Sequence, residues 1–203
     1  MNAMEMNRRA LLERMLLLVG ASAIPAGCSL AGGPGRDFAF SSEQLAQVTA
    51  IADTLIPKGD SVGALDAKVP ANLEILLRNW ASAERLEEML ASLEKLDGAA
   101  SQAKGKQFAA LDAATRLAVL KAHEVEAMKP DPGKQPEGGL AMFMGPAHVD
   151  EGYAKLRELI VKLFYYSQAA LTQELSYEHD PGGYKPSVPI TPEIRPGGGM
   201  SPI

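Results

Sequence analysis

The sequence predicts an all-α protein, a single bundle of about five helices, and three observations lead to that fold class. Apolar residues recur at intervals of three and four through most of residues 41–176. No stretch alternates polar and apolar residues with β-branched side chains, so a sheet is not expected. The segments with helical spacing are separated by breaks that contain Pro or Gly. We therefore expect one helical domain over residues 41–176.

The expected helices are defined by local start and stop residues. The first begins at Ser41, which with Gln44 has the spacing of a capping box, and it ends at Pro57. Gly98 is expected to end the third helix. The four helices after the first are expected over residues 69–80, 82–98, 108–128 and 150–175, with a loop over residues 129–148 before the last.

Residues 1–27 have the features of an export signal. Arg8 and Arg9 precede a short, mostly apolar stretch that is too short to span a membrane. The paired arginines favour the twin-arginine route, and the alternative is an ordinary secretory signal. Two outcomes are open: cleavage after Ala23, or lipidation of Cys28 in a sequence similar to a lipobox. A flexible linker is expected over residues 28–40.

The chain changes character again at its C-terminal end. Residues 177–203 are rich in Pro and Gly and cannot form a helix. This segment is either a disordered tail or an extended arm that lies on another surface. Tyr177 and Tyr184 are spaced apolar anchors that favour the arm.

Composition excludes several classes of partner. The formal net charge is −5, and no run of Lys or Arg is present, which argues against nucleic acid and anionic lipid surfaces. Contact with a membrane is expected only through the signal or a lipid anchor. Because Cys28 is the one cysteine, the helical domain has no disulfide, thiolate metal site or cysteine nucleophile.

The sequence also lacks a recognisable catalytic or cofactor-binding motif. His123 has no second ligand three or four residues away, and we expect it to be a polar surface residue. His179 and Asp180 are neighbours in the tail, where a solvated pair is expected. No nucleotide-binding loop or haem-attachment motif is present. We therefore expect no cofactor, metal or catalytic residue in this chain.

Three stretches, taken in order, resemble the gluconate 2-dehydrogenase subunit 3 family, the small subunit of periplasmic flavin-dependent sugar and sugar-acid dehydrogenases. They are "IADTLIPKGDSVGALDAKVP" (51–70), "LRELIVKLFYYSQAALTQELSY" (156–177) and "DPGGYKP" (180–186). Each is weak alone, but the ordered set, together with the signal, covers most of the chain. Residues 129–148 have no counterpart in these motifs.

The resemblance implies a non-catalytic role in an oxidoreductase complex that acts in sugar oxidation. Family members accompany a large FAD-dependent subunit of the GMC type that has no export signal of its own. The small subunit then serves as an escort through the twin-arginine translocase, with Arg8 and Arg9 carrying both proteins into the periplasm. A multihaem cytochrome c, which holds haem c, is the expected electron acceptor. The identity of the sugar would be set by the large subunit.

The resemblance also supplies candidate contacts with the large subunit. They come from its three motifs: Asp53, Pro57, Asp60, Gly63, Ala64, Tyr165, Tyr166, Tyr177, Pro181, Gly182 and Tyr184. For residues 53–64 the alternative is a corner that only sets the packing of two helices. For the whole chain, the competing classes are a small periplasmic hydrolase or isomerase and a stand-alone exported lipoprotein.

Overall fold

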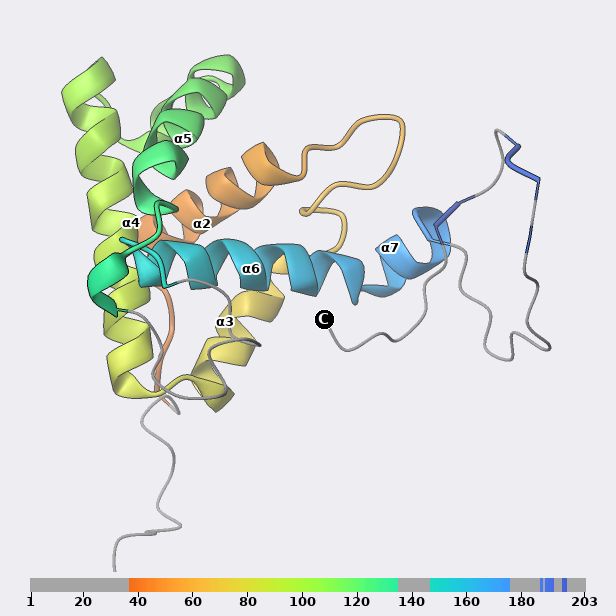
Figure 1. The fold of residues 1–203 in the computed structure, drawn as a ribbon, viewed down its shortest axis with the longest axis horizontal. Helices are drawn as coiled ribbons and strands as arrows, with labels where there is room; N and C mark the ends of the chain where they lie inside the picture. The colour runs from red at the N-terminus through yellow and green to blue at the C-terminus, as the bar shows by residue number, and fades with distance from the viewer. Residues whose placement is uncertain (1–36, 135–146, 176–186, 188, 192–194, 197–203) are drawn as a thin grey trace, which may run out of the picture. The chain divides into compact units, whose positions relative to one another are not determined.

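The computed structural model describes residues 37–134, 147–175, 187, 189–191 and 195–196, and this part of the chain is helical (Figure 1). All of these residues belong to one compact unit, Pro34–Ile203. The α-helices are α2 (Ser42–Leu55), α3 (Val69–Trp80), α4 (Ala83–Lys104), α5 (Ala113–Ala127), α6 (Glu151–Tyr165) and α7 (Gln168–Gln173). Two short 3₁₀ helices, η1 (Phe108–Ala110) and η2 (Pro132–Lys134), complete the described elements. The all-α prediction is confirmed.

The start of α2 is the predicted one. Ser41 accepts a hydrogen bond from the Gln44 amide at 3.2 Å, and the Gln44 side chain accepts one from the Ser41 amide at 2.9 Å. These two bonds form the capping box and satisfy amides that have no partner inside the helix.

The predicted end of the third helix is wrong. α4 continues through Gly98 to Lys104 and stops at Gly105, where φ is +68°. Glycine adopts this left-handed conformation without steric cost, whereas Gly98 keeps helical geometry on the exposed side of α4. Beyond Gly98, Ala100 is buried and the neighbouring alanines have high helix propensity, which outweighs the low helix propensity of a single glycine.

Two other predicted helices are each divided. The segment 108–128 consists of η1 followed by α5, because Asp112 caps α5 by accepting a hydrogen bond from the Thr115 amide at 3.0 Å. The segment 150–175 is divided into α6 and α7, because Ser167 accepts a hydrogen bond from the Ala170 amide at 3.1 Å. In both cases a short polar side chain bonds to nearby backbone amides and starts a new helix.

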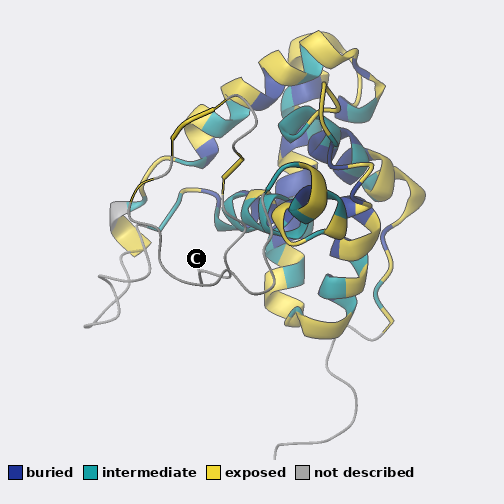
Figure 2. Ribbon diagram, turned by 90° about the vertical axis from the view of Figure 1, so that its right-hand side faces the viewer, coloured by how far each residue is buried: buried dark blue, intermediate teal, exposed yellow. Residues whose placement is uncertain are grey.

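α6 lies at the centre of the packing. It contacts α3, α4, α5 and α7, while α2 packs against α3, α4, α5 and η1. The buried side of α6 carries Tyr153, Leu156, Ile160 and Phe164, which recur at helical spacing. Figure 2 shows the buried residues on the sides of the helices that face one another and the exposed residues on the outer sides.

Close contact between α4 and α6 depends on Gly152. A Cβ atom at this position would lie 2.2 Å from the Glu88 carbonyl oxygen and 2.4 Å from Ser92 Oγ. The two helices can therefore approach at this distance only if residue 152 has no side chain.

Several predicted features lie outside the described residues. They are the signal with Arg8 and Arg9, Cys28, most of the linker 28–40, residues 135–146 of the long loop, and the tail residues Tyr177, Pro181, Gly182 and Tyr184. The ends of the long loop are described and are paired. The Asp131 amide donates to the Ala147 carbonyl at 2.8 Å, and the Val149 amide donates to the Lys129 carbonyl at 2.9 Å.

Candidate functional site

The candidate site is the corner between α2 and α3, defined here as residues 56–68. Pro57 ends α2, and the chain turns outward and then returns to start α3 at Val69-Pro70. Residues 57–61 are exposed, whereas Gly63 and Ala64 are buried. The corner therefore has an exposed tip and a buried base.

Backbone hydrogen bonds close the base of the corner. The Ala64 amide donates to the Ile56 carbonyl at 2.9 Å, and the Val69 amide donates to the Ala64 carbonyl at 3.0 Å. Ala64 has no exposed surface. A Cβ atom on Gly63 would lie 2.6 Å from the Lys58 amide nitrogen. The outgoing and returning segments of the corner can therefore approach this closely only with glycine at position 63.

The Asp66 carboxylate fixes the tip to the base. It accepts hydrogen bonds from the Gly63 amide and from Lys58 Nζ, both at 3.0 Å. The Gly63 hydrogen bond, followed by that from Lys58, holds the pKa of Asp66 below its ordinary value. The carboxylate therefore remains charged at neutral pH and keeps both partners.

Lys68 adopts a strained backbone conformation at the end of the corner. Its φ of +55° is the single positive value for a non-glycine residue in the described part of the chain. Such a conformation costs on the order of 1 kcal/mol for a residue with a Cβ atom. The surrounding hydrogen bonds hold this conformation, so the corner is a preorganised surface loop rather than a flexible linker.

The structure places the corner candidates in two different environments. Pro57 and Asp60 lie at the exposed tip, where a partner can reach them. Gly63 and Ala64 are buried at the base, so they support the tip and offer no side chain to a partner.

Asp53 has a contact within the chain. Its carboxylate accepts a hydrogen bond from Arg116 Nη2 at 3.1 Å, which links the last turn of α2 to α5. The Asp53 side chain is 34% exposed and Arg116 is 17% exposed. This ion pair positions the end of α2 from which the corner departs.

Exposed aromatic residues lie on other elements. Tyr165 and Tyr166, at the end of α6, are 47% and 56% exposed. Trp80, the one tryptophan of the chain, lies at the end of α3 and is 83% exposed. Exposed Trp and Tyr are typical of contact surfaces between proteins, and Trp80 is not among the contact candidates that the sequence supplied.

A buried polar cluster at the start of α6 was also missed. Asp150 is 6% exposed, and its carboxylate accepts hydrogen bonds from Ser92 Oγ at 2.5 Å and Lys95 Nζ at 2.9 Å. It also caps α6 by accepting from the Tyr153 amide at 3.0 Å. Burial by itself would raise the pKa of Asp150, but these hydrogen bonds outweigh burial and lower it. The signal available in the sequence for this cluster was Ser92, a polar residue at a position of α4 that faces the core.

The prediction for His123 is wrong. The side chain is half-buried and packs edge-on against Tyr153, with 4.8 Å between ring centroids. Nε2 is buried and has no hydrogen-bond partner within the described residues. Tyr153 is held in turn by Glu124, which accepts from its hydroxyl at 3.2 Å and from Arg157 Nε at 2.8 Å. His123 is therefore part of the packing between α5 and α6.

These groups are not arranged for nucleophilic catalysis. Ser92 is 1% exposed, and its hydroxyl bonds to the Asp150 carboxylate rather than to an imidazole. A serine nucleophile needs access to substrate, which Ser92 lacks, and the neighbouring Asp150 carboxylate is a weak base because its pKa is lowered. In the described residues, no group of three or more His, Cys, Asp and Glu side chains could hold a metal ion. Among the helices of those residues, none is both long and apolar enough to cross a membrane.

The comparisons with known proteins agree with the motif resemblance. The family model described as gluconate 2-dehydrogenase subunit 3 matches residues 42–182, which is more than half of the chain. The match extends from the first residue of α2 past α7 and includes the corner. No curated protein and no solved structure matches the chain.

Proposed function

We propose that the chain, which belongs to the gluconate 2-dehydrogenase subunit 3 family, escorts and binds a flavoprotein partner. Members of this family are accessory subunits of a dehydrogenase complex. On this proposal the partner is a GMC-type dehydrogenase that holds the FAD, and a multihaem cytochrome c with haem c accepts the electrons. The complex works in the periplasm, where Cys28, if lipidated, also anchors it to the membrane. The observation that carries the proposal is the family match over residues 42–182.

Two features of the chain support an accessory rather than a catalytic role. Ser92 and Asp150 are buried and bond to each other, and the exposed Lys95 also donates to Asp150, so these hydrogen bonds stabilise the junction of α4 and α6. The corner at residues 56–68 is preorganised and exposes polar groups at its tip. A rigid exposed loop lowers the entropy lost on binding, which suits a permanent subunit contact.

The escort role depends on Arg8 and Arg9. They lie in a signal-like segment, and a folded flavoprotein with no signal of its own requires such a segment on its partner. The double substitution Arg8→Lys and Arg9→Lys is expected to retain both proteins in the cytoplasm. The measurement is cell fractionation with flavin absorbance and immunodetection of each subunit.

Arg14→Lys is the matched control, because Arg14 lies in the same segment but outside the arginine pair. We expect its fractionation to be that of the unmodified chain. A flavoprotein that reaches the periplasm with the doubly substituted chain would contradict the escort role, even if the two subunits bind each other.

A further inference from the structure

A groove on the described surface lies between the N-terminal half of α2, the middle of α4 and η1. Its volume is about 480 Å³. Leu90 and Leu93 of α4 are its larger apolar lining residues, and Ala46 of α2 and Ala109 of η1 are the smaller ones. The groove is separate from the corner at residues 56–68, since it is lined by the opposite end of α2.

The charged residues that line the groove are all acidic. Glu43, Glu94 and Asp97 contribute carboxylates, and no Lys or Arg is among the lining residues. Within the described residues, neither Glu43 nor Glu94 forms an ion pair, whereas Glu88 of α4 pairs with Arg85 at 2.7 Å. Asp97 accepts one hydrogen bond, from the Phe108 amide at 2.9 Å, which leaves its charge without a cation. The groove therefore has negative charge that the described chain does not neutralise.

The neighbouring helix terminus does not supply the missing positive charge. The N-terminus of α2 carries a partial positive charge, but the capping box already satisfies the Ser41 and Gln44 amides. Glu43 lies in the first turn of α2, where its negative charge offsets the partial positive charge of the helix terminus. The groove is consequently suited to a cation and not to an anionic ligand such as a sugar acid.

We propose that this groove binds a Lys- or Arg-bearing segment of the dehydrogenase partner subunit. The inference rests on the proposed function, since it assigns the partner a second contact on this chain. The aliphatic part of a Lys or Arg side chain packs on the lining leucines, and its charged end bonds to the carboxylates at the rim. An apolar lining with an acidic rim is complementary to such side chains in both respects.

The test is a charge reversal at the rim. Glu43 and Glu94 are exposed on helices, so Glu43→Lys with Glu94→Lys is expected to leave the bundle folded, which circular dichroism checks. The Kd is measured between the purified chain and the purified flavin-containing subunit, at low and at physiological salt. We expect binding to be weaker by at least about tenfold, with a smaller dependence on salt. The double substitution to Gln should give an intermediate Kd.

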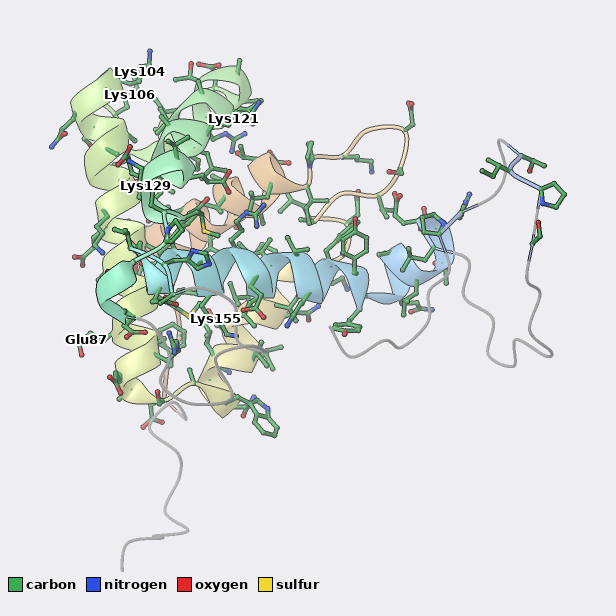
Figure 3. The ribbon with its side chains drawn as sticks, in the orientation of Figure 1. Glu87, Lys104, Lys106, Lys121, Lys129 and Lys155 are labelled. Atoms are coloured by element: carbon green, nitrogen blue, oxygen red, sulfur yellow. The ribbon has the colours of Figure 1, made fainter. Side chains whose placement is uncertain are left out.

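Glu87→Lys is the matched control. Glu87 is an exposed carboxylate on the same helix, it does not line the groove, and it projects from the outer side of α4 (Figure 3). Its reversal changes the net charge per site by the same amount, so it separates the groove from a general effect of charge. We expect the Kd to change by less than about twofold for this variant.

A second variant tests the groove by shape. Ala46→Trp adds a large side chain to the lining of the groove without changing charge, and we expect it to weaken binding as well. An unmodified chain that binds the flavoprotein, together with equal binding by the reversed and filled variants, would overturn the groove while leaving the proposed function intact. An unmodified chain that does not bind the flavoprotein would overturn both.

Discussion

At the scale of single residues, the polar groups buried between α4, α5 and α6 decide how stability responds to pH. Asp150 is satisfied by three donors and stays charged, whereas His123 has a buried nitrogen with no hydrogen-bond partner among the described residues. Burial, followed by the charge of Lys95, lowers the pKa of His123, while Asp150 and Glu124 act in the opposite direction. The net shift is downward from the ordinary value of 6.5.

This shift predicts that acid destabilises the helical domain through His123. The unfolded chain binds a proton near pH 6.5, but the folded chain binds it only at lower pH. The stability of the folded state is therefore complete above about pH 6.5 and falls as the pH drops toward the folded-state pKa. His123→Phe keeps a ring against Tyr153 and removes the titration, so its free energy of unfolding should fall less on acidification.

The measurement is urea unfolding of both chains between about pH 5 and pH 8. We expect the two curves of free energy against pH to diverge below about pH 6.5, by about 1.4 kcal/mol for each unit of pKa difference. Parallel curves across the whole range would contradict the assignment of this acid sensitivity to His123.

At the scale of elements, the two glycines of α4 have opposite roles. Gly98 is exposed inside the helix, and a Cβ atom there would meet nothing within 4 Å. Gly105 ends the helix with a positive φ. We expect Gly98→Ala to raise the free energy of unfolding by about 0.5–1 kcal/mol, because alanine has the higher helix propensity. Gly105→Ala should lower it by about 1 kcal/mol, because alanine is strained at this φ.

Thermal and urea unfolding of both variants test this pair directly. Each substitution adds one methyl group at a site with open space, so packing differences are small and backbone conformation dominates. A stabilised Gly105→Ala, or a destabilised Gly98→Ala, would mean that α4 ends near Gly98 in solution.

The contrast between these glycines explains what sequence reasoning could and could not predict. The start of α2 was predictable, because the capping box is a local pattern of two side chains and two amides. The end of α4 was not, because the sequence does not show which of the two glycines, Gly98 or Gly105, adopts the left-handed conformation that ends the helix. The division at Ser167 was missed for a related reason: apolar spacing continues across it, and only the cap interrupts the helix.

The same contrast between local patterns and long-range packing applies to the candidate site. The corner could be located from its motif, but the sequence did not distinguish exposed Pro57 and Asp60 from buried Gly63 and Ala64. The Ser92–Asp150 contact joins residues 58 positions apart, and no local pattern predicts such a contact. The groove likewise combines α2, α4 and η1. Features that depend on how helices pack required the structure.

At the scale of the whole molecule, the question is where the folded unit ends. The described core extends from Phe40 to Ala170, and Ala170 of α7 has no exposed surface. α7 packs against α6, which is itself the centre of the bundle. Residues 177–203 lie after this core in the sequence and include Tyr177 and Tyr184, the expected anchors for the partner.

Deleting residues 177–203 is therefore expected to leave the bundle intact and to weaken binding of the flavoprotein. The free energy of unfolding should change by less than about 0.5 kcal/mol, because no residue of the described core is removed. Loss of two aromatic anchors should weaken association by about 1–3 kcal/mol for each anchor. The measurements are circular dichroism with urea unfolding, and the Kd for the flavin-containing subunit.

Deletion from Ser167 onward is the matched control, because it also removes α7 and the buried Ala170. We expect this longer deletion to lower the free energy of unfolding by about 1–3 kcal/mol, since it exposes the surface of α6 that α7 covers. If the shorter deletion destabilised the bundle as much as the longer one, the folded unit would extend into the tail. If the shorter deletion left the Kd unchanged, contact with the partner would lie on the helical domain, and the corner and the acidic groove would then have to supply it.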